Sequence, residues 1–346
     1  MMNPVSSSSA VNIGIIGLGH AGMSLHLPKL CRNTRASILA VADIQDERLT
    51  KFSLAYPNLK VKKVRDYQEL LEDEKIQAVF VTSPTPTHFE IAMDALRAGK
   101  HVFCEKPISS SVEEATQLVQ EAESRSQSQV LMIGHVIRYW PDYVAIKRTI
   151  DSGTIGEPVI ARAYRAIRMP DGWEDFYGKS DQSGGVLFDL SIHDIDFLIW
   201  CLGNVSSVYA QGGHLSGRGD RDLIDYAQVH LDFESGAMAY VESNWAVPKS
   251  FPFTTAFEIS CRGGMVSVSN SQAHSSMELT LNDQEKLIRN PWERDGYFLE
   301  EDAFLDSVTS TPHGSPIAPK DALYSLKVAN AARESIHYNG KEVFPK

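Results

Sequence analysis

Three ionisable side chains have the types and the placement that proton transfer requires. Asp189 and His193 lie four residues apart in an apolar stretch, so a helix would present them one turn apart on the same face. An imidazole held in one tautomer by a carboxylate is a good general base near neutral pH. A core histidine satisfied by a neighbouring carboxylate is the alternative interpretation, since a buried pair needs partners.

Lys106 is the third of these residues. It stands between Glu105 and Pro107, after a short run of strand-forming residues at 101–103. If that strand is parallel to its neighbours, Lys106 arrives at its carboxyl end, where open α/β sheets bind ligands. A lysine there can hydrogen-bond a reacting oxygen and stabilise negative charge on it. A solvated surface lysine is the alternative.

A G-x-G-x-x-G run between a predicted strand and a predicted helix has the spacing of a phosphate-binding turn. In such a turn the first glycine permits the bend and the second lets a diphosphate approach the backbone. The third lets helix and strand pack closely, and the helix N-terminus binds the diphosphate. A packing turn without a ligand is the alternative. The run consists of Gly17, Leu18, Gly19, His20, Ala21 and Gly22.

Asp43 ends the next predicted strand and bears on the choice of cofactor. A carboxylate at this place can accept both ribose hydroxyls of a dinucleotide and would repel a 2′-phosphate. The next two residues, Ile44 and Gln45, supply no cation to offset that repulsion. NAD is therefore predicted as the cofactor ahead of NADP.

The periodicity of the chain predicts two domains that hold these residues. Short apolar runs alternate with amphipathic stretches up to about residue 132, which predicts a doubly wound parallel α/β sheet. The predicted strands are 11–17, 38–42, 76–82, 101–103 and 130–134, and the predicted helices are 21–31, 46–55, 89–98 and 112–126.

The pattern changes near residue 135, where successive strand-forming runs with short connections begin and predict a second, α+β domain with a large, mostly antiparallel sheet. We expect a disordered tail at 1–10, a first domain at 11–135 and a second at 136–346. Periodicity alone leaves open whether the final helix, at about 320–338, packs back on the first domain. The other predicted elements are a helix at 143–151, strands at 159–167, 205–211, 226–233, 238–245 and 257–262, and a helical run at 297–308.

Together these motifs resemble those of the glucose-fructose oxidoreductase and inositol dehydrogenase family, known as Gfo/Idh/MocA. The resemblance rests on the glycine turn, on the strand ends at 82–88 and 105–107, and on residues 184–196, where an Asp and a His lie four apart. It implies an N-terminal Rossmann domain, a C-terminal α+β domain and a cis peptide bond between Lys106 and Pro107.

The resemblance also implies an NAD(P)-dependent dehydrogenase or reductase that acts on a secondary hydroxyl or ketone of a sugar, a sugar derivative or a cyclitol such as inositol. Lys106, Asp189 and His193 would be catalytic, with His193 as the base. Cofactor contacts would come from Gly17, Leu18, Gly19, His20, Ala21, Gly22, Asp43, Ile44, Ser83, Pro84, Thr85, His88, Glu105, Lys106 and Arg138. Substrate contacts would come from Lys106, Arg168, Trp173, Asp189, His193 and Tyr297.

Alternatives remain at this point. A regulator of this family would sense NAD or a sugar without chemistry, and we expect it to lose the lysine or the Asp/His pair, which this chain retains. A redox-assisted elimination enzyme would return the hydride to its substrate. The loop that carries Arg168 and Trp173 could form a dimer contact instead of a substrate site.

Composition argues against several classes of partner. The chain has 33 Lys and Arg against 44 Asp and Glu, a net charge of −11, and no basic block, so nucleic acid is not expected. It has no long uncharged apolar run, no secretory signal and no metal-ligand spacing among its 4 cysteines. We expect a cytoplasmic protein without metal or membrane partner, and the resemblance implies a homodimer or homotetramer.

Overall fold

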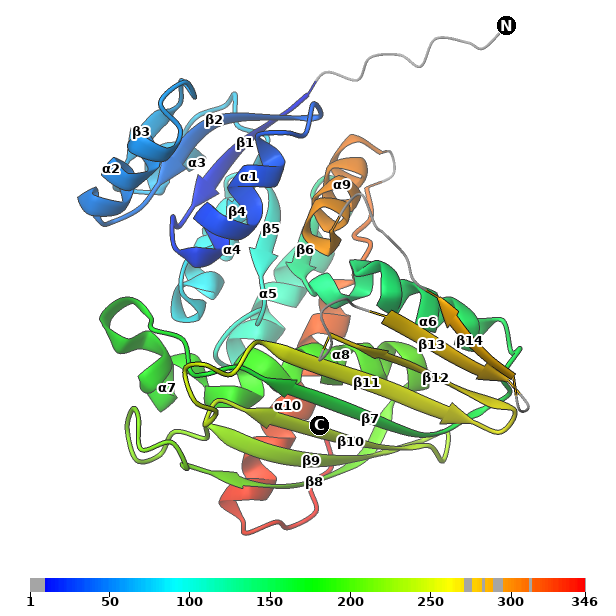
Figure 1. The fold of residues 1–346 in the computed structure, drawn as a ribbon. Helices are drawn as coiled ribbons and strands as arrows, with labels where there is room; N and C mark the ends of the chain where they lie inside the picture. Colours follow the sequence, from blue (N-terminus) through cyan, green and yellow to red (C-terminus); the bar gives the residue numbers. More distant parts are fainter. Residues whose placement is uncertain (1–9, 271–275, 282–283, 289–294, 311–312, 346) are drawn as a thin grey trace, which may run out of the picture. The chain divides into compact units, whose positions relative to one another are not determined.

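The computed structural model describes residues 10–270, 276–281, 284–288, 295–310 and 313–345, so the expected tail lies outside the described residues except for Ala10. The chain divides into two units (Figure 1). The first consists of Met1–Gly134 and Tyr297–Lys320, and the second of His135–Gly296 and Asp321–Lys346.

The first unit is built on a six-stranded sheet in the order β3-β2-β1-β4-β5-β6, with every neighbouring pair parallel. The chain order reverses between β1 and β4, which creates the crevice where doubly wound sheets bind dinucleotides. Central strands of such a sheet are buried on both faces, and all four residues of β4 are buried. The strands are β1 (Val11–Ile16), β2 (Ala36–Ala42), β3 (Lys62–Val64), β4 (Ala78–Val81), β5 (His101–Glu105) and β6 (Leu131–Gly134).

Helices cover this sheet. Ser111 begins α5 by accepting a hydrogen bond from the Glu114 N–H, which satisfies one free donor of the first turn. The helices are η1 (Ala21–His26) continuing into α1 (Leu27–Leu30), α2 (Asp46–Ala55), α3 (Gln68–Leu71), η2 (Thr85–Thr87) continuing into α4 (His88–Arg97), α5 (Val112–Ser124) and, from much later in the chain, α9 (Gly296–Thr309).

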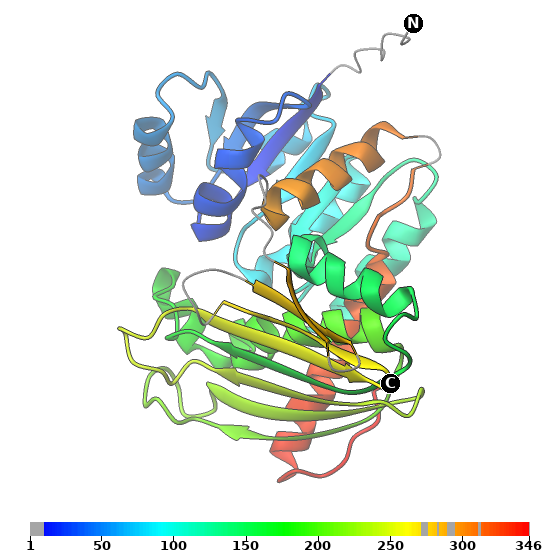
Figure 2. The same ribbon diagram turned by 45° about the vertical axis from the view of Figure 1, so that its right-hand side comes forward.

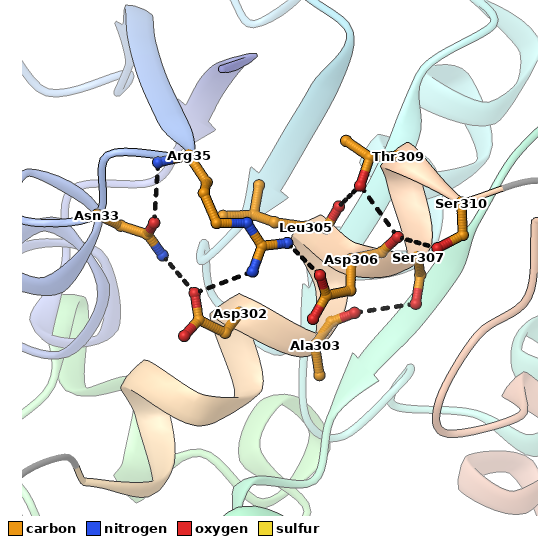
Figure 3. Close-up of polar contacts among 9 residues, drawn as sticks. All are labelled: Asn33, Arg35, Asp302, Ala303, Leu305, Asp306, Ser307, Thr309 and Ser310. Carbon is orange, nitrogen blue, oxygen red and sulfur yellow. Dashed lines mark hydrogen bonds and ion pairs between the residues drawn. The ribbon is translucent and has the colours of Figure 1, made fainter. Parts of the chain in front are cut away.

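The late helix α9 lies across the first sheet (Figure 2). The ring of Phe304 meets the rings of Phe80 and Phe103 edge-on, at centroid distances of 5.3 and 5.7 Å. At the edge of this contact, Asn33 and Arg35 donate hydrogen bonds to the Asp302 carboxylate, and Arg35 also reaches Asp306 (Figure 3). The helix therefore completes the core of the first unit.

The second unit contains an eight-stranded sheet in the order β14-β13-β12-β11-β7-β10-β9-β8. All neighbouring pairs are antiparallel except β7 and β10, which are parallel. The strands are β7 (Pro158–Ala166), β8 (Val205–Gly213), β9 (Tyr226–Phe233), β10 (Met238–Asn244), β11 (Thr254–Cys261), β12 (Gly264–Ser269), β13 (Ser276–Leu281) and β14 (Gln284–Ile288).

One face of this sheet is covered by helices, and the other, which we call the open face, is not (Figure 1). Burial alternates along β9 and β10, as expected for a sheet with a core on one side. The helices of this unit are η3 (Val136–Tyr139), α6 (Pro141–Asp151), η4 (Trp173–Gly178), α7 (Ser180–Ser183), η5 (Leu187–Ser191), α8 (Ile192–Leu202) and α10 (Pro319–His337).

The predicted architecture, a parallel Rossmann sheet followed by a mostly antiparallel α+β part, is confirmed. The division of the chain differs from the expected ranges in one respect. The helix that returns to the first unit is α9, because Phe304 and Leu305 are buried there, whereas most of α10 belongs to the second unit.

Candidate active site

The glycine turn packs against the carboxyl end of β4. Gly17 has a φ of +97°, and a Cβ there would lie 2.5 Å from the backbone nitrogen of Ser83. A Cβ at Gly22 would lie 2.2 Å from the carbonyl oxygen of Gly17. Both positions therefore require glycine, and the turn holds Ser83 beside it.

Asp43 lies under the same turn. Its Oδ2 accepts the Leu18 N–H at 2.8 Å and its Oδ1 accepts the Gln45 N–H at 2.9 Å. Ile44, the next residue, is 59% exposed, and its contact with the cofactor stays a prediction.

Arg48, which the sequence analysis missed, brings a cation to this place. Its Nη1 lies 3.5 Å from Asp43 Oδ2, and the same nitrogen is the nearest atom to a Cβ built at Gly19, at 3.2 Å. The expected cofactor preference rests on the two residues after Asp43, whereas Arg48 approaches from within α2. A cation five residues after a strand-end acid, in the first turn of the next helix, is a signal that sequence reasoning could use.

His88 joins the ends of β4 and β5. Its Nε2 lies 2.8 Å from the Ser83 carbonyl oxygen, and its Nδ1 lies 2.8 Å from the Pro107 carbonyl oxygen. The ring is buried, and burial lowers the pKa of His88. His88 thus holds two loops at the carboxyl edge of the sheet, while direct contact with a cofactor stays a prediction.

The Glu105, Lys106 and Pro107 segment ends β5 at the same edge. Glu105 is buried, Lys106 is half-exposed, and the peptide bond between Lys106 and Pro107 is cis, as the resemblance implies. Glu105 Oε2 accepts the backbone N–H of Lys106 at 3.1 Å. Its other oxygen faces His26, a residue that sequence analysis did not single out.

In the second unit, η5 runs directly into α8 and carries the Asp/His pair. Asp189 and His193 are half-buried, whereas the residues between them and the five that follow His193 are buried. The two side chains therefore interrupt an otherwise buried stretch of helix. This arrangement agrees with the expectation that one helix presents both groups on one face.

Two buried ion pairs anchor this helix. Arg138 donates two hydrogen bonds of 2.8 Å to Asp196 and lies 3.3 Å from Asp321. Arg165 donates two of 2.9 Å to Asp194. Desolvation by burial raises the pKa of Asp196, but the positive charges of His135 and Arg138 outweigh it and hold that pKa below its usual value. Arg138 is thus committed to these carboxylates, and its predicted contact with the cofactor stays a prediction.

The remaining predicted substrate residues occupy different places. Arg168 is half-exposed in the segment after β7. The helix η4 begins at Trp173, whose side chain lies outside the described part of the structure. Tyr297 belongs to the first unit, where its ring meets the His26 ring edge-on at 5.7 Å and Lys29 lies over it.

The residues of the first unit fit a dinucleotide. The turn leaves no room for a side chain at Gly17 or Gly22, the helix η1 starts directly after it, and the acid lies at the end of β2. Within the described ranges, no group of three His, Cys, Asp or Glu side chains could hold a metal ion. Nor do those ranges contain a helix long and apolar enough to cross a membrane.

Comparison with known proteins agrees with this geometry. Residues 11–135 match the family model "Oxidoreductase family, NAD-binding Rossmann fold", and residues 143–267 match the "GFO/IDH/MocA C-terminal domain". The chain is 31% identical over 333 residues to the oxidoreductase YrbE of Bacillus subtilis, covering 94% of each chain. It is 28% identical over 337 residues to the myo-inositol 2-dehydrogenase of Thermotoga maritima, covering 94% of this chain and 96% of that one.

A solved structure extends the likeness at the level of the fold. Levoglucosan dehydrogenase, in complex with NADH and levoglucosan, matches with a TM-score of 0.86 at 20% identity, over 97% of this chain and 99% of that chain. Fold and glycine turn thus define an NAD-binding oxidoreductase. The chain belongs to the Gfo/Idh/MocA family, so the resemblance, the enzyme class and the cofactor expected from the sequence are confirmed.

Proposed function

We propose that this oxidoreductase is a dehydrogenase or reductase that moves a hydride between NAD and a secondary hydroxyl or ketone of a sugar, a sugar derivative or a cyclitol. The observation that carries the proposal is the pair Asp189 and His193, which remain half-buried in the otherwise buried η5 and α8 helix. A polar acid and base kept at such a position suit proton transfer to or from a bound polyol.

In the proposed reaction, side chains of the protein move the proton and stabilise the reacting oxygen. Bound NAD would supply the hydride acceptor for the carbinol carbon. A ring nitrogen of His193 takes the hydroxyl proton, and the Asp189 carboxylate orients the ring and stabilises the charge that it gains. The ammonium of Lys106 donates a hydrogen bond to the reacting oxygen, and it stabilises negative charge there when the reaction runs towards reduction.

The substrate class rests on the relatives and on residues of the second unit. The relative from Thermotoga maritima is named for myo-inositol, and the structure of levoglucosan dehydrogenase is a complex with levoglucosan. In this chain we propose that Arg168 hydrogen-bonds hydroxyl groups of the substrate and that Trp173 stacks on a sugar face. A dimer contact for this loop is the competing assignment.

The test is the absorbance of reduced nicotinamide with inositols, hexoses, pentoses, sugar acids and their keto forms, first with NAD(H) and then with NADP(H). A substrate that responds with NAD(H) and loses its response in His193→Ala supports the proposal. If NAD binds by calorimetry and no compound responds, the dehydrogenase is overturned. Hydride that leaves a substrate and returns, traced with a deuterated compound, would instead identify redox-assisted elimination.

We also propose that the open face forms a homo-oligomer. Ile160 on β7 and Met238 on β10 are register partners, and they are 36% and 50% exposed. Tyr226 and Tyr240 are half-exposed on the neighbouring strands β9 and β10. A sheet face that exposes apolar and aromatic side chains between charged ones such as Arg162, Glu242 and Glu258 suits association with a second copy of the chain.

A further inference from the structure

His26 is a buried histidine at the meeting point of three chain segments. It ends η1, directly after the glycine turn, and none of its surface is exposed. Its Nε2 lies 2.8 Å from Glu105 Oε1 at the end of β5, and its Nδ1 lies 3.0 Å from Glu301 Oε1 on α9. The rings of Phe80, Phe103 and Tyr297 enclose it at centroid distances of 5.1 to 5.7 Å.

The geometry fixes the charge of this ring. Each ring nitrogen faces a carboxylate oxygen, and only the doubly protonated imidazolium can donate to both. Desolvation by burial opposes the charge, but the hydrogen bonds and charges of Glu105 and Glu301 outweigh it and raise the pKa of His26 to about 10. A charged ring between two ionised, buried carboxylates donates to one oxygen of each, which an uncharged ring facing the same ionised pair could not do.

The network reaches Lys106 through one residue. Glu105 accepts from His26 with Oε1 and from the Lys106 backbone N–H with Oε2. The carboxylate is therefore held from both sides, and Lys106 cannot turn without disturbing it. The hydrogen bond from His26 also lowers the pKa of Glu105 against the opposing effect of burial, so the carboxylate remains ionised.

We propose that His26 is a positioning residue, whose buried imidazolium holds Glu105 and, through it, the backbone that directs the Lys106 ammonium at the reacting oxygen. The inference rests on the proposed function for the role of Lys106, and it adds a residue that touches neither substrate nor cofactor. Because a misplacement of about 1 Å can cost roughly a hundredfold in rate, a partial loss of this support is measurable.

The test is His26→Gln, which fills a similar volume but can donate to only one carboxylate while its amide oxygen faces the other. We expect kcat to fall about tenfold, while the Kd of NAD by calorimetry changes less than about threefold. The double variant His26→Gln/Glu301→Gln provides an amide donor where the carboxylate would repel, and it should recover at least about threefold in kcat.

Arg35→Gln is the matched control. It removes the contacts of Arg35 with Asp302 and Asp306, which hold the same helix α9 without touching Glu105. It should lower Tm and leave kcat unchanged. If His26→Gln and Arg35→Gln lose activity only in proportion to their loss of Tm, or if the double variant recovers nothing, the positioning role is overturned.

An NMR measurement that does not depend on catalysis tests this inference separately from the proposed function. With 13C-labelled lysine, the Lys106 side-chain resonance, assigned through Lys106→Arg, should shift in His26→Gln and not in Arg35→Gln. A shift in a protein that oxidises no polyol would retain the positioning role and reject the proposed substrates. An unchanged resonance with unchanged kcat would reject the positioning role alone.

Discussion

Arg138 and Asp196 face each other through two parallel hydrogen bonds of 2.8 Å, although 58 positions separate them in the chain. Arg165 and Asp194 repeat the arrangement two residues earlier on α8. Since His193 lies on the same helix, the proposed base is carried by an element that two buried ion pairs fix to η3 and β7. Such pairs are costly to break, because the remaining charge stays buried.

Asp196→Asn should therefore lower the free energy of unfolding by about 3–5 kcal/mol, since it leaves the buried Arg138 guanidinium without its main carboxylate. Denaturant titration measures the change. Glu69→Gln is the control, because it breaks the Lys62–Glu69 pair of the first unit, whose side chains are 50% and 49% exposed, and should cost at most about 1 kcal/mol. Similar losses in both variants would contradict the assignment.

Lys106→Met should lower turnover by at least about two orders of magnitude, because it removes the hydrogen-bond donor proposed for the reacting oxygen. NAD binding should survive, since the glycine turn and Asp43 are untouched. Stopped-flow absorbance gives the rate, and calorimetry gives the NAD affinity. Full activity in this variant would exclude the role of Lys106.

Asp43→Ser should shift the cofactor preference towards NADP. The substitution removes the carboxylate that would repel a 2′-phosphate, and it frees the Arg48 guanidinium, now 3.5 Å from Asp43, to pair with that phosphate. The ratio of kcat/KM for the two cofactors measures the effect. Asp43→Ser/Arg48→Ala is the control and should gain much less, so an equal gain in both variants would show that Arg48 takes no part.

The stability of the protein should fall as pH rises above neutrality. His26 has a folded pKa of about 10 against 6.5 for a free histidine, so its proton stabilises the folded state fully below pH 6.5. This contribution decreases between those two values and is lost above about pH 10. Glu105 and Glu301 are the carboxylates that face the ring, and the Tyr297 ring lies beside it.

Free energies of unfolding from pH 6.5 to 9.5 test this expectation. His26→Gln should flatten the decline, whereas Arg35→Gln should give a less stable protein whose curve runs parallel to wild type. Parallel curves for wild type and His26→Gln would show that His26 is not charged in the folded protein.

Ile160→Glu/Met238→Glu should dissociate the proposed homo-oligomer, because four charges would meet at a dimer interface formed by the open face. Light scattering at micromolar concentration gives the mass. Leu54→Glu, at a 76% exposed position on α2, is the control and should leave the mass unchanged. A monomeric wild-type protein would reject the proposal outright.

Elements with strong local patterns were predictable from the sequence. The helix α2 and the strand β9 have the predicted bounds, since the amphipathic period of one and the alternation of the other are complete within the segment. The strand β3 was missed because it has only three residues, two of them exposed lysines. The strands β12 to β14 were missed too, and β12 mixes glycine and serine with its apolar residues.

The residues of the candidate site also divide into those that a local sequence pattern predicts and those that only the folded chain brings together. The glycine turn, Asp43 and the Asp/His pair have local spacings that sequence can show. The partners of His26 lie 79 and 275 positions away in the chain, and contacts between residues so far apart leave no periodic pattern in the sequence. The return of α9 to the first unit depends on the burial of Phe304 between distant rings, which likewise only the folded chain shows.

Because α9 belongs to the first unit, that unit is completed only late in biosynthesis. A ribosome releases residues 1–134 long before it makes Tyr297–Lys320, so the nascent NAD-binding unit lacks the ring that covers Phe80 and Phe103 and the Glu301 carboxylate that balances His26. The growing chain must carry this uncovered sheet through the synthesis of His135–Gly296, which is most of the second unit. A fragment cut at Gly134 would keep its apolar surface exposed, and only a fusion that supplies α9 would give a well-behaved isolated cofactor domain.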